Sequence, residues 1–168
     1  MHAIFATIAM FAAAGAAPTT TTTKTKPHTT SSPAGAPSAD EALKVSNYYF
    51  DGKDSGPLLV KFIACLKVDE VETSKTKNEC TTPVTGAVAK GSDVFGWTQW
   101  VVPVGASYDD VSLQFLLDGA VRETKDIPLT ESLRLRTWRP ATASKAGKWT
   151  IKLMRGGKEV SSVDFEVK

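Results

Sequence analysis

The stretch "WTIKLMRGGKEVSSVDFEVK", residues 149–168, contains two short runs in which apolar and polar residues alternate. Trp149, Ile151 and Leu153 alternate with polar side chains in the first run, and Val163, Phe165 and Val167 do so in the second. A period of two places one side of each run against a core and the other in water, as in an antiparallel sheet. The Gly-Gly pair between the runs is typical of a two-residue β-hairpin turn. The stretch therefore predicts a closing hairpin, with the Trp149 indole in the core.

The same pattern extends toward the N-terminus, where short runs rich in β-branched and aromatic residues are separated by Gly, Pro and Asp-Gly turns. Asp118-Gly119 is a second hairpin signal. We expect strands near 45–50, 58–66, 94–102, 111–117, 120–126, 133–139, 148–155 and 160–167. This arrangement predicts an all-β fold, an antiparallel immunoglobulin-like sandwich of about seven to eight strands.

The first part of the chain has a different composition. Residues 1–17 are small and apolar and end near Ala14-Gly15-Ala16, the pattern of a signal peptide, although no Lys or Arg precedes the apolar run. Residues 18–39 are a Thr/Ser/Pro-rich linker that we expect to be disordered, and 40–168 form the β-sandwich domain. We therefore expect export to the periplasm or cell surface, with no stable membrane span once the signal is cleaved.

Two local features refine this organisation. Ser38 followed by Glu41 matches a capping box that would open a short turn of helix. Cys65 and Cys80 are the only cysteines, and in an oxidising compartment they can form a disulfide contributing about 3 kcal/mol. The alternative is that Cys65 is a buried free thiol. Two cysteines without a pair of histidines fall short of a zinc site.

The charge of the domain bears on its partners. Lys24 and Lys26 are the only Lys or Arg before Asp40, and no Asp or Glu precedes it, so 18 of the 20 basic and all 18 acidic residues fall in 40–168. A nucleic-acid-binding domain usually carries a net positive charge to neutralise phosphates. The neutral balance predicts that nucleic acid is not a partner.

Catalytic groups are scarce in this sequence. The two histidines, His2 and His28, lie in the signal and the linker, so no domain residue supplies a base with a pKa near neutrality. Ser74 and Lys77 match S-x-x-K in form but stand in the most polar segment, without the motifs that accompany that signature in enzymes. We therefore predict a non-enzymatic protein without a cofactor or a metal.

Aromatic residues remain as candidates for a site. Along "VFGWTQWVVP", residues 94–103, Trp97 and Trp100 point to opposite sides of the strand, so we expect one of them to be near the surface. Trp138 lies on the same side of its strand as Arg134 and Arg136, an arrangement suited to cation–π contacts. The candidate ligand-binding residues are Trp100, Trp138, Arg136 and Arg139. The alternative is structural, with each Trp covering an edge of the core.

The order of these segments resembles a poorly characterised bacterial family of exported or membrane-associated β-sandwich domains. The matching pieces are "VFGWTQW", "VSLQFLLDGAVRETKDIPL", the R-x-W segment "RTWRP", the G-x-W-x-V-like segment "GKWTIKL" and "VDFEV". Two positions depart from the family pattern: Leu113-Gln114-Phe115 replaces a His-x-Trp, and Arg139-Pro140 replace Ser-Ser. The resemblance implies the fold and an exported location, and it implies no activity.

These observations together predict a non-enzymatic binding or accessory domain of the cell envelope, with a glycan, a peptidoglycan fragment or a protein as its ligand. The alternative is a structural subunit that assembles into a surface complex or appendage through an edge strand.

Overall fold

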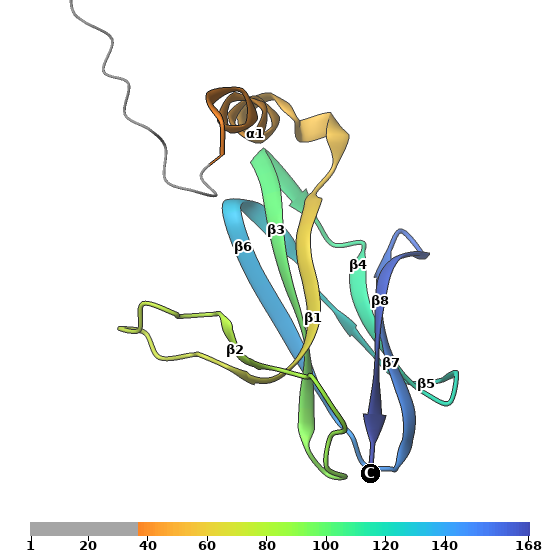
Figure 1. Ribbon diagram of the computed structural model, residues 1–168. Coiled ribbons are helices and arrows are strands. Elements are labelled where there is room, and N and C mark those ends of the chain that lie inside the picture. The colour runs from red at the N-terminus through yellow and green to blue at the C-terminus, as the bar shows by residue number, and fades with distance from the viewer. Residues whose placement is uncertain (1–36) are drawn as a thin grey trace, which may run out of the picture. The chain divides into compact units, whose positions relative to one another are not determined.

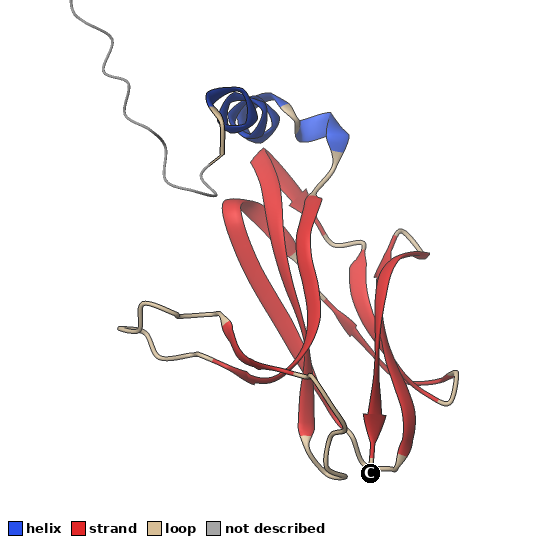
Figure 2. Cartoon of the chain, viewed as in Figure 1, coloured by secondary structure: helices blue, strands red, loops and turns tan. Residues whose placement is uncertain are grey.

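The computed structural model describes residues 37–168. The predicted signal peptide, 1–17, and all but the last three residues of the predicted linker, 18–39, lie outside the described residues. The described chain is all-β apart from one helix and one helical turn, and its eight strands form two four-stranded antiparallel sheets (Figures 1 and 2). No helix within 37–168 is both long and apolar enough to cross a membrane.

We call the two sheets A and B. Sheet A has the order β2-β1-β3-β6 and sheet B the order β5-β4-β7-β8. The bounds of the strands are β1 Leu58–Val68, β2 Cys80–Pro83, β3 Asp93–Tyr108, β4 Val111–Leu117, β5 Ala120–Asp126, β6 Leu129–Thr142, β7 Gly147–Arg155 and β8 Lys158–Val167. The strands β4 and β5 coincide with the predicted ranges, and the two predicted hairpins join β4 to β5 and β7 to β8.

Both hairpins turn through residues with positive φ. Asp118 and Gly119 have φ of 50° and 81°, and Gly156 and Gly157 have φ of 54° and 76°. Two consecutive left-handed residues match the right-handed twist of the flanking strands, which is why Asp-Gly and Gly-Gly favour this turn. The local sequence is therefore sufficient to specify these two hairpins.

The region expected to be a strand at 45–50 is a helix, and that prediction is wrong. Helix α1 spans Ala39–Asp51, and the 3₁₀ turn η1 spans Lys53–Ser55. The predicted capping box is present: Ser38 Oγ accepts from the Glu41 backbone N–H, and the Glu41 carboxylate accepts from the Ser38 backbone N–H. Because no Gly or Pro interrupts the chain before Gly52, the helix that begins at this cap continues through Val45 and the aromatic residues after it.

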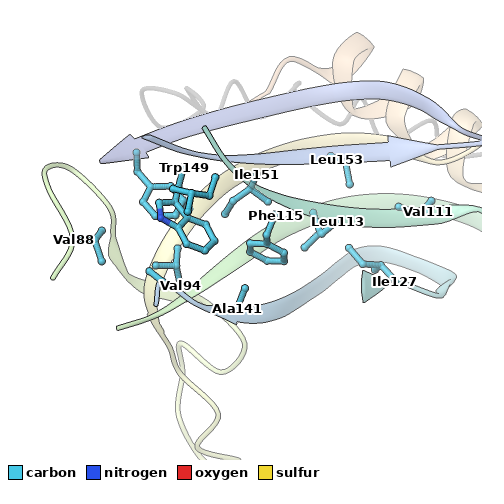
Figure 3. Packing of buried hydrophobic residues seen from close by; sticks show 14 of the residues in the cluster. Val88, Val94, Val111, Leu113, Phe115, Ile127, Ala141, Trp149, Ile151 and Leu153 are labelled. Atoms are coloured by element: carbon cyan, nitrogen blue, oxygen red, sulfur yellow. The ribbon is translucent and has the colours of Figure 1, made fainter. Parts of the chain in front are cut away.

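The core lies between the inner faces of the two sheets. Leu113, Phe115, Ile151 and Leu153 of sheet B are fully buried there, and Figure 3 shows Trp149 in the same layer. The Trp149 ring stacks on Phe165 with the centroids 6.3 Å apart, which confirms its predicted place in the core. Hydrophobic burial across this layer supplies the main stabilisation of the domain.

Candidate binding surfaces

The most elaborate surface feature is the segment Asp69–Glu79 between β1 and β2, which we call the arm. The predicted disulfide between Cys65 and Cys80 is present and closes the base of the arm, with an S–S distance of 2.04 Å. The alternative of a free Cys65 thiol is wrong, because neither cysteine is unpaired. Figure 1 shows the arm leaving the β1–β2 edge of sheet A. The four-residue strand β2 that follows it was not predicted.

The arm is ordered by one carboxylate near its start. Asp69 accepts hydrogen bonds from the Thr76 hydroxyl at 2.6 Å, the Val71 backbone N–H at 3.1 Å and the Ser74 hydroxyl at 2.5 Å. These bonds favour the charged form, with those from Ser74 and Thr76 contributing most, so the pKa of Asp69 lies below its usual value of 3.8. The Asp69 backbone N–H also donates to the Glu79 carbonyl at 2.9 Å, which closes the arm as a loop.

The arm lies over the outer face of sheet A, where it covers a second small cluster of aromatic residues. Trp97 and Trp138 are directly paired across β3 and β6, so their indoles lie side by side on this face. The Trp97 Nε1–H donates to the Asn78 carbonyl at 2.8 Å, and the Trp138 Nε1–H donates to the Glu70 carboxylate at 3.1 Å. Trp97 is consequently only 1% exposed, although it points away from the main core.

Two guanidinium groups hold the end of the arm. Arg134 and Arg136 both contact the Glu79 carboxylate, with N–O distances of 2.6 Å and 2.7 Å. Arg136 also donates to the Lys77 carbonyl at 3.2 Å, while its Nε atom is buried without a partner in this structure. Of the side chains that the sequence singled out on β6, Trp138, Arg134 and Arg136 therefore contact the protein's own arm.

The structure brings together only some of the predicted ligand-binding residues. Trp138 and Arg136 lie on the outer face of sheet A, and Arg139 donates to the Trp138 carbonyl at 2.8 Å. Trp100 is on the opposite, inner face and is 1% exposed, with its Nε1–H donating to the Thr98 hydroxyl at 2.8 Å. Trp100, one of the candidate ligand-binding residues, is therefore not accessible to a ligand in this structure. The expectation that one of Trp97 and Trp100 would be near the surface fails, because the arm covers the outer face.

A second candidate surface was not predicted. It is a cleft of about 400 Å³ at the open edge of the sandwich, bounded by β5, the end of β6 and the start of β7. Its floor is apolar and buried, and its rim carries charged and hydroxyl side chains. The lining residues are Phe115, Leu117, Arg122, Glu123, Ala141, Thr142, Ser144, Lys145 and Trp149. We call this feature the cleft.

A β-bulge places Arg122 at one side of the cleft. Phe115 pairs with Glu123 and Leu116 with Val121, so Arg122 is the extra residue on β5. A bulge redirects the side chain of the inserted residue and increases the local twist of the strand. Without the bulge, Arg122 would pair with a residue of β4, and its side chain would take its turn in the alternation between the two faces of β5.

The opposite side of the cleft is a loop whose backbone is fixed by hydrogen bonds. The Trp149 Nε1–H donates to the Lys145 carbonyl at 2.9 Å. The Ala143 backbone N–H donates to the Ser92 carbonyl at 2.8 Å, and the Ala143 carbonyl accepts from Gly91 N–H at 2.8 Å. The backbone that carries the Thr142, Ser144 and Lys145 side chains is therefore preorganised, while these side chains remain exposed.

The acidic residue at the cleft is neutralised by an ion pair, whereas the two basic residues there are not. Glu123 is paired with Lys125 at 2.9 Å, which offsets its charge. Arg122 and Lys145 form no ion pair with any residue in the described part of the chain, 37–168. Two exposed cations and the Ser144 hydroxyl are thus available at the rim, a combination suited to binding an oxyanion.

The described residues also show where the S-x-x-K segment lies. Ser74 and Lys77 both belong to the arm, where the Ser74 hydroxyl is bound to Asp69 and Lys77 is paired with Glu72. No group of three or more His, Cys, Asp or Glu side chains within residues 37–168 could hold a metal ion.

Comparison with known proteins gives little similarity. No family model matches the chain, and no curated protein matches it. A solved structure that matches is the alkylpurine DNA glycosylase AlkC of Pseudomonas fluorescens, bound to DNA that contains an abasic-site analogue. The sequence identity is 10%, the TM-score is 0.43, and the match covers 67% of this chain and 30% of that one.

Two predictions drawn from the sequence find no support in these comparisons and are not upheld: a binding domain or structural subunit of the cell envelope, and a chain with no nucleic-acid partner. The second prediction relied on net charge, which sums over the whole surface and says nothing of a local patch. The first relied on an accessible Trp100 and Trp138, of which the former is buried and the latter engaged by the arm. A likeness with a TM-score of 0.43 carries no argument that this chain binds DNA or acts as a glycosylase.

Proposed function

We propose that this domain binds a small organic anion in the cleft and that it does so without catalysing a reaction. The observation that carries the proposal is the pair of cations Arg122 and Lys145, which flank one cleft without an ion-pair partner among residues 37–168. Ligand sites commonly combine an apolar lining with a few polar groups that orient the ligand, in volumes of about 300–1,000 Å³. The cleft, at about 400 Å³, has these features.

The chemistry of the rim favours an oxyanion. A guanidinium can form two parallel hydrogen bonds to a carboxylate or phosphate, and a Lys ammonium adds a charge-assisted bond. The Ser144 hydroxyl can donate to a further oxygen of the ligand, whereas the Thr142 hydroxyl donates to the Asp93 carboxylate at 2.7 Å. Because the loop backbone on that side is held by the bonds to Trp149 and Ser92, little ordering of the site is needed on binding.

The proposal extends to the class of the fold and to the location of the protein. The two packed antiparallel sheets support an immunoglobulin-like sandwich, and the disulfide supports an exported protein, as does the N-terminal sequence pattern. We keep the resemblance to the exported bacterial family with R-x-W and G-x-W-x-V motifs as part of this proposal. Residues 37–168 contain no histidine, which supports a binding role without catalysis.

Calorimetric titration of the full chain with benzoate and phenyl phosphate tests the proposal, with benzyl alcohol as the neutral analogue. We expect dissociation constants of roughly 0.1–1 mM for the anions and no measurable binding of the alcohol. Arg122→Gln and Lys145→Gln should each weaken binding by roughly tenfold or more, since a hydrogen bond to a charged group contributes about 1.5–3 kcal/mol.

Lys158→Gln is the matched control, because Lys158 is an exposed cation without an ion pair in residues 37–168 and lies outside the cleft. This variant should bind the anions as the parent chain does. If no anion binds up to roughly 10 mM, or if all three variants lose affinity equally, the cleft is not an anion site. The cations on β5 would then serve only to protect an edge strand from pairing with other chains.

A further inference from the structure

The contacts that hold the arm use groups that any acidic peptide offers. The arm presents two backbone carbonyls, of Lys77 and Asn78, and two carboxylates, of Glu70 and Glu79. The two carbonyls are backbone groups that any peptide has, and the other two contacts require only a carboxylate side chain. The arm as a whole carries four acidic and two basic residues, so it is itself an acidic segment.

The groups that receive the arm belong to regular strands. Trp97 is on β3 and Trp138 and Arg136 are on β6, where backbone pairing between the two strands fixes their spacing. Arg134 is also on β6, at the register shift between Leu135 and Ser132. Their positions therefore derive from the register of sheet A and not from the arm. Trp and Arg are the side chains that contribute most of the binding energy at protein interfaces.

We propose that the outer face of β3 and β6 is a binding surface for an acidic, extended segment of another protein, and that the arm occupies this surface as an internal competitor. The bound segment would place one carboxylate between Arg134 and Arg136 and a second at the Trp138 indole N–H, as Glu79 and Glu70 do now. This surface is separate from the cleft, so the inference does not depend on the proposed function.

The arm competes strongly because it is tethered. A short tether gives an effective concentration in the millimolar range, so a free peptide binds the closed domain only weakly. When the binding-competent state is a small fraction of the population, the apparent affinity falls by that fraction. Loosening the arm without altering the strands should therefore raise the affinity for an acidic peptide.

The probe for the experiment is a fluorescein-labelled peptide with the sequence of residues 68–79, "VDEVETSKTKNE". The host is the full chain carrying Glu70→Ala and Glu79→Ala, which removes both anchoring carboxylates of the arm and leaves the disulfide intact. Fluorescence anisotropy should show the probe binding this variant roughly tenfold or more tightly than the parent chain. Hydrogen exchange of the arm reports in parallel whether the arm has detached.

Two controls test the chemistry of the surface. A probe with Gln at the positions of Glu70 and Glu79 should lose most of the binding, and so should the host with Arg136→Gln added. Lys158→Gln in the same host, on the other sheet, should leave binding unchanged. A second host, Cys65→Ser with Cys80→Ser, opens the arm by a different route, and circular dichroism establishes that each host is folded.

The outcomes separate clearly. Tighter binding that depends on the probe carboxylates and on Arg136 supports the proposal. If the arm detaches and the probe still does not bind, or binds equally after Arg136→Gln, the surface has no affinity for an acidic segment. If the arm stays protected from exchange in every folded host, the surface is not accessible to a partner and the proposal is wrong.

Discussion

Replacing Gly96 with alanine should destabilise the domain, because side chains of the opposite sheet pack directly against this residue. A Cβ atom built on Gly96 would lie 2.6 Å from Leu113 Cδ1 and 3.2 Å from Ile151 Cγ2, both in the opposite sheet. Favourable carbon–carbon contacts are about 3.5–4.0 Å, so the Leu113 methyl would have to move by about 1 Å. Leu113 and Ile151 are fully buried, and because protein cores are close-packed this movement would displace neighbouring core side chains.

The expected cost follows from this geometry. Overpacking a well-packed core costs about 1–3 kcal/mol, and the higher strand propensity of alanine recovers about 0.5–1 kcal/mol. The difference is a net loss of up to about 2.5 kcal/mol, and the short 2.6 Å contact favours its upper half, seen in urea unfolding as a lower midpoint with an unchanged slope. Gly86→Ala is the control, because no atom lies within 4 Å of its built Cβ, and it should change the stability by less than about 0.5 kcal/mol.

A double-mutant cycle identifies the contact responsible. Leu113→Ala alone should cost about 2–5 kcal/mol through the cavity that it leaves. In the double variant the methyl group that Gly96→Ala adds occupies part of that cavity, so the combined cost should fall short of the sum by about 1 kcal/mol or more. Two results would refute the argument that packing against the opposite sheet requires glycine at position 96. One is a Gly96→Ala variant as stable as the parent chain. The other is a double variant whose loss of unfolding free energy equals the sum of the two single losses.

Three further predictions concern hydrogen bonds. Thr98→Val should destabilise the domain by about 1–3 kcal/mol in chemical unfolding, because it leaves the buried Trp100 N–H unpaired, whereas Thr98→Ser should retain most of the stability. The pKa of Asp69 is lowered in the folded state, so its contribution is present above about pH 4 and is lost as the pH falls through the folded-state pKa. Hydrogen exchange of the arm should therefore rise below about pH 4 in the parent chain, and Asp69→Asn should remove this pH dependence. Ser38→Ala should weaken α1 by about 1 kcal/mol, read from exchange of the Glu41 amide, with unchanged exchange in the strands as the control.

The features that the sequence predicted well are those set by neighbouring residues. The hairpins at Asp118-Gly119 and Gly156-Gly157 depend on turn chemistry within two residues, and the place of Trp149 depends on the alternation along one strand. The strand expected at 45–50 was wrong, although that prediction also rested on neighbouring residues. Its β-branched and aromatic residues favour strands, but the helix that begins at Ser38 extends through them.

The candidate sites were less predictable, because they join residues far apart in the chain. Alternation correctly placed Trp138 with Arg134 and Arg136 on one side of β6, but it could not show that this side is covered by a polar segment some sixty residues earlier. The cysteine pair was the only signal that the arm folds back on the sheet.

The cleft left no signal in the sequence. Arg122 owes its position to a β-bulge, whose occurrence depends on the pairing of β4 with β5, and Lys145 lies on a loop from another part of the chain. Each residue taken alone is an ordinary surface cation.

The sequence by itself determined the all-β class, the two hairpins and the capping box, because periodicity and turn chemistry act within a few residues. Only the tertiary structure decided which face of each sheet is covered and which charges lack a partner. Those properties depend on the packing of segments that are remote in sequence, and no local pattern records it. The pairing of indoles with cations on β6 is the clearest instance, since its role depends on where the arm lies.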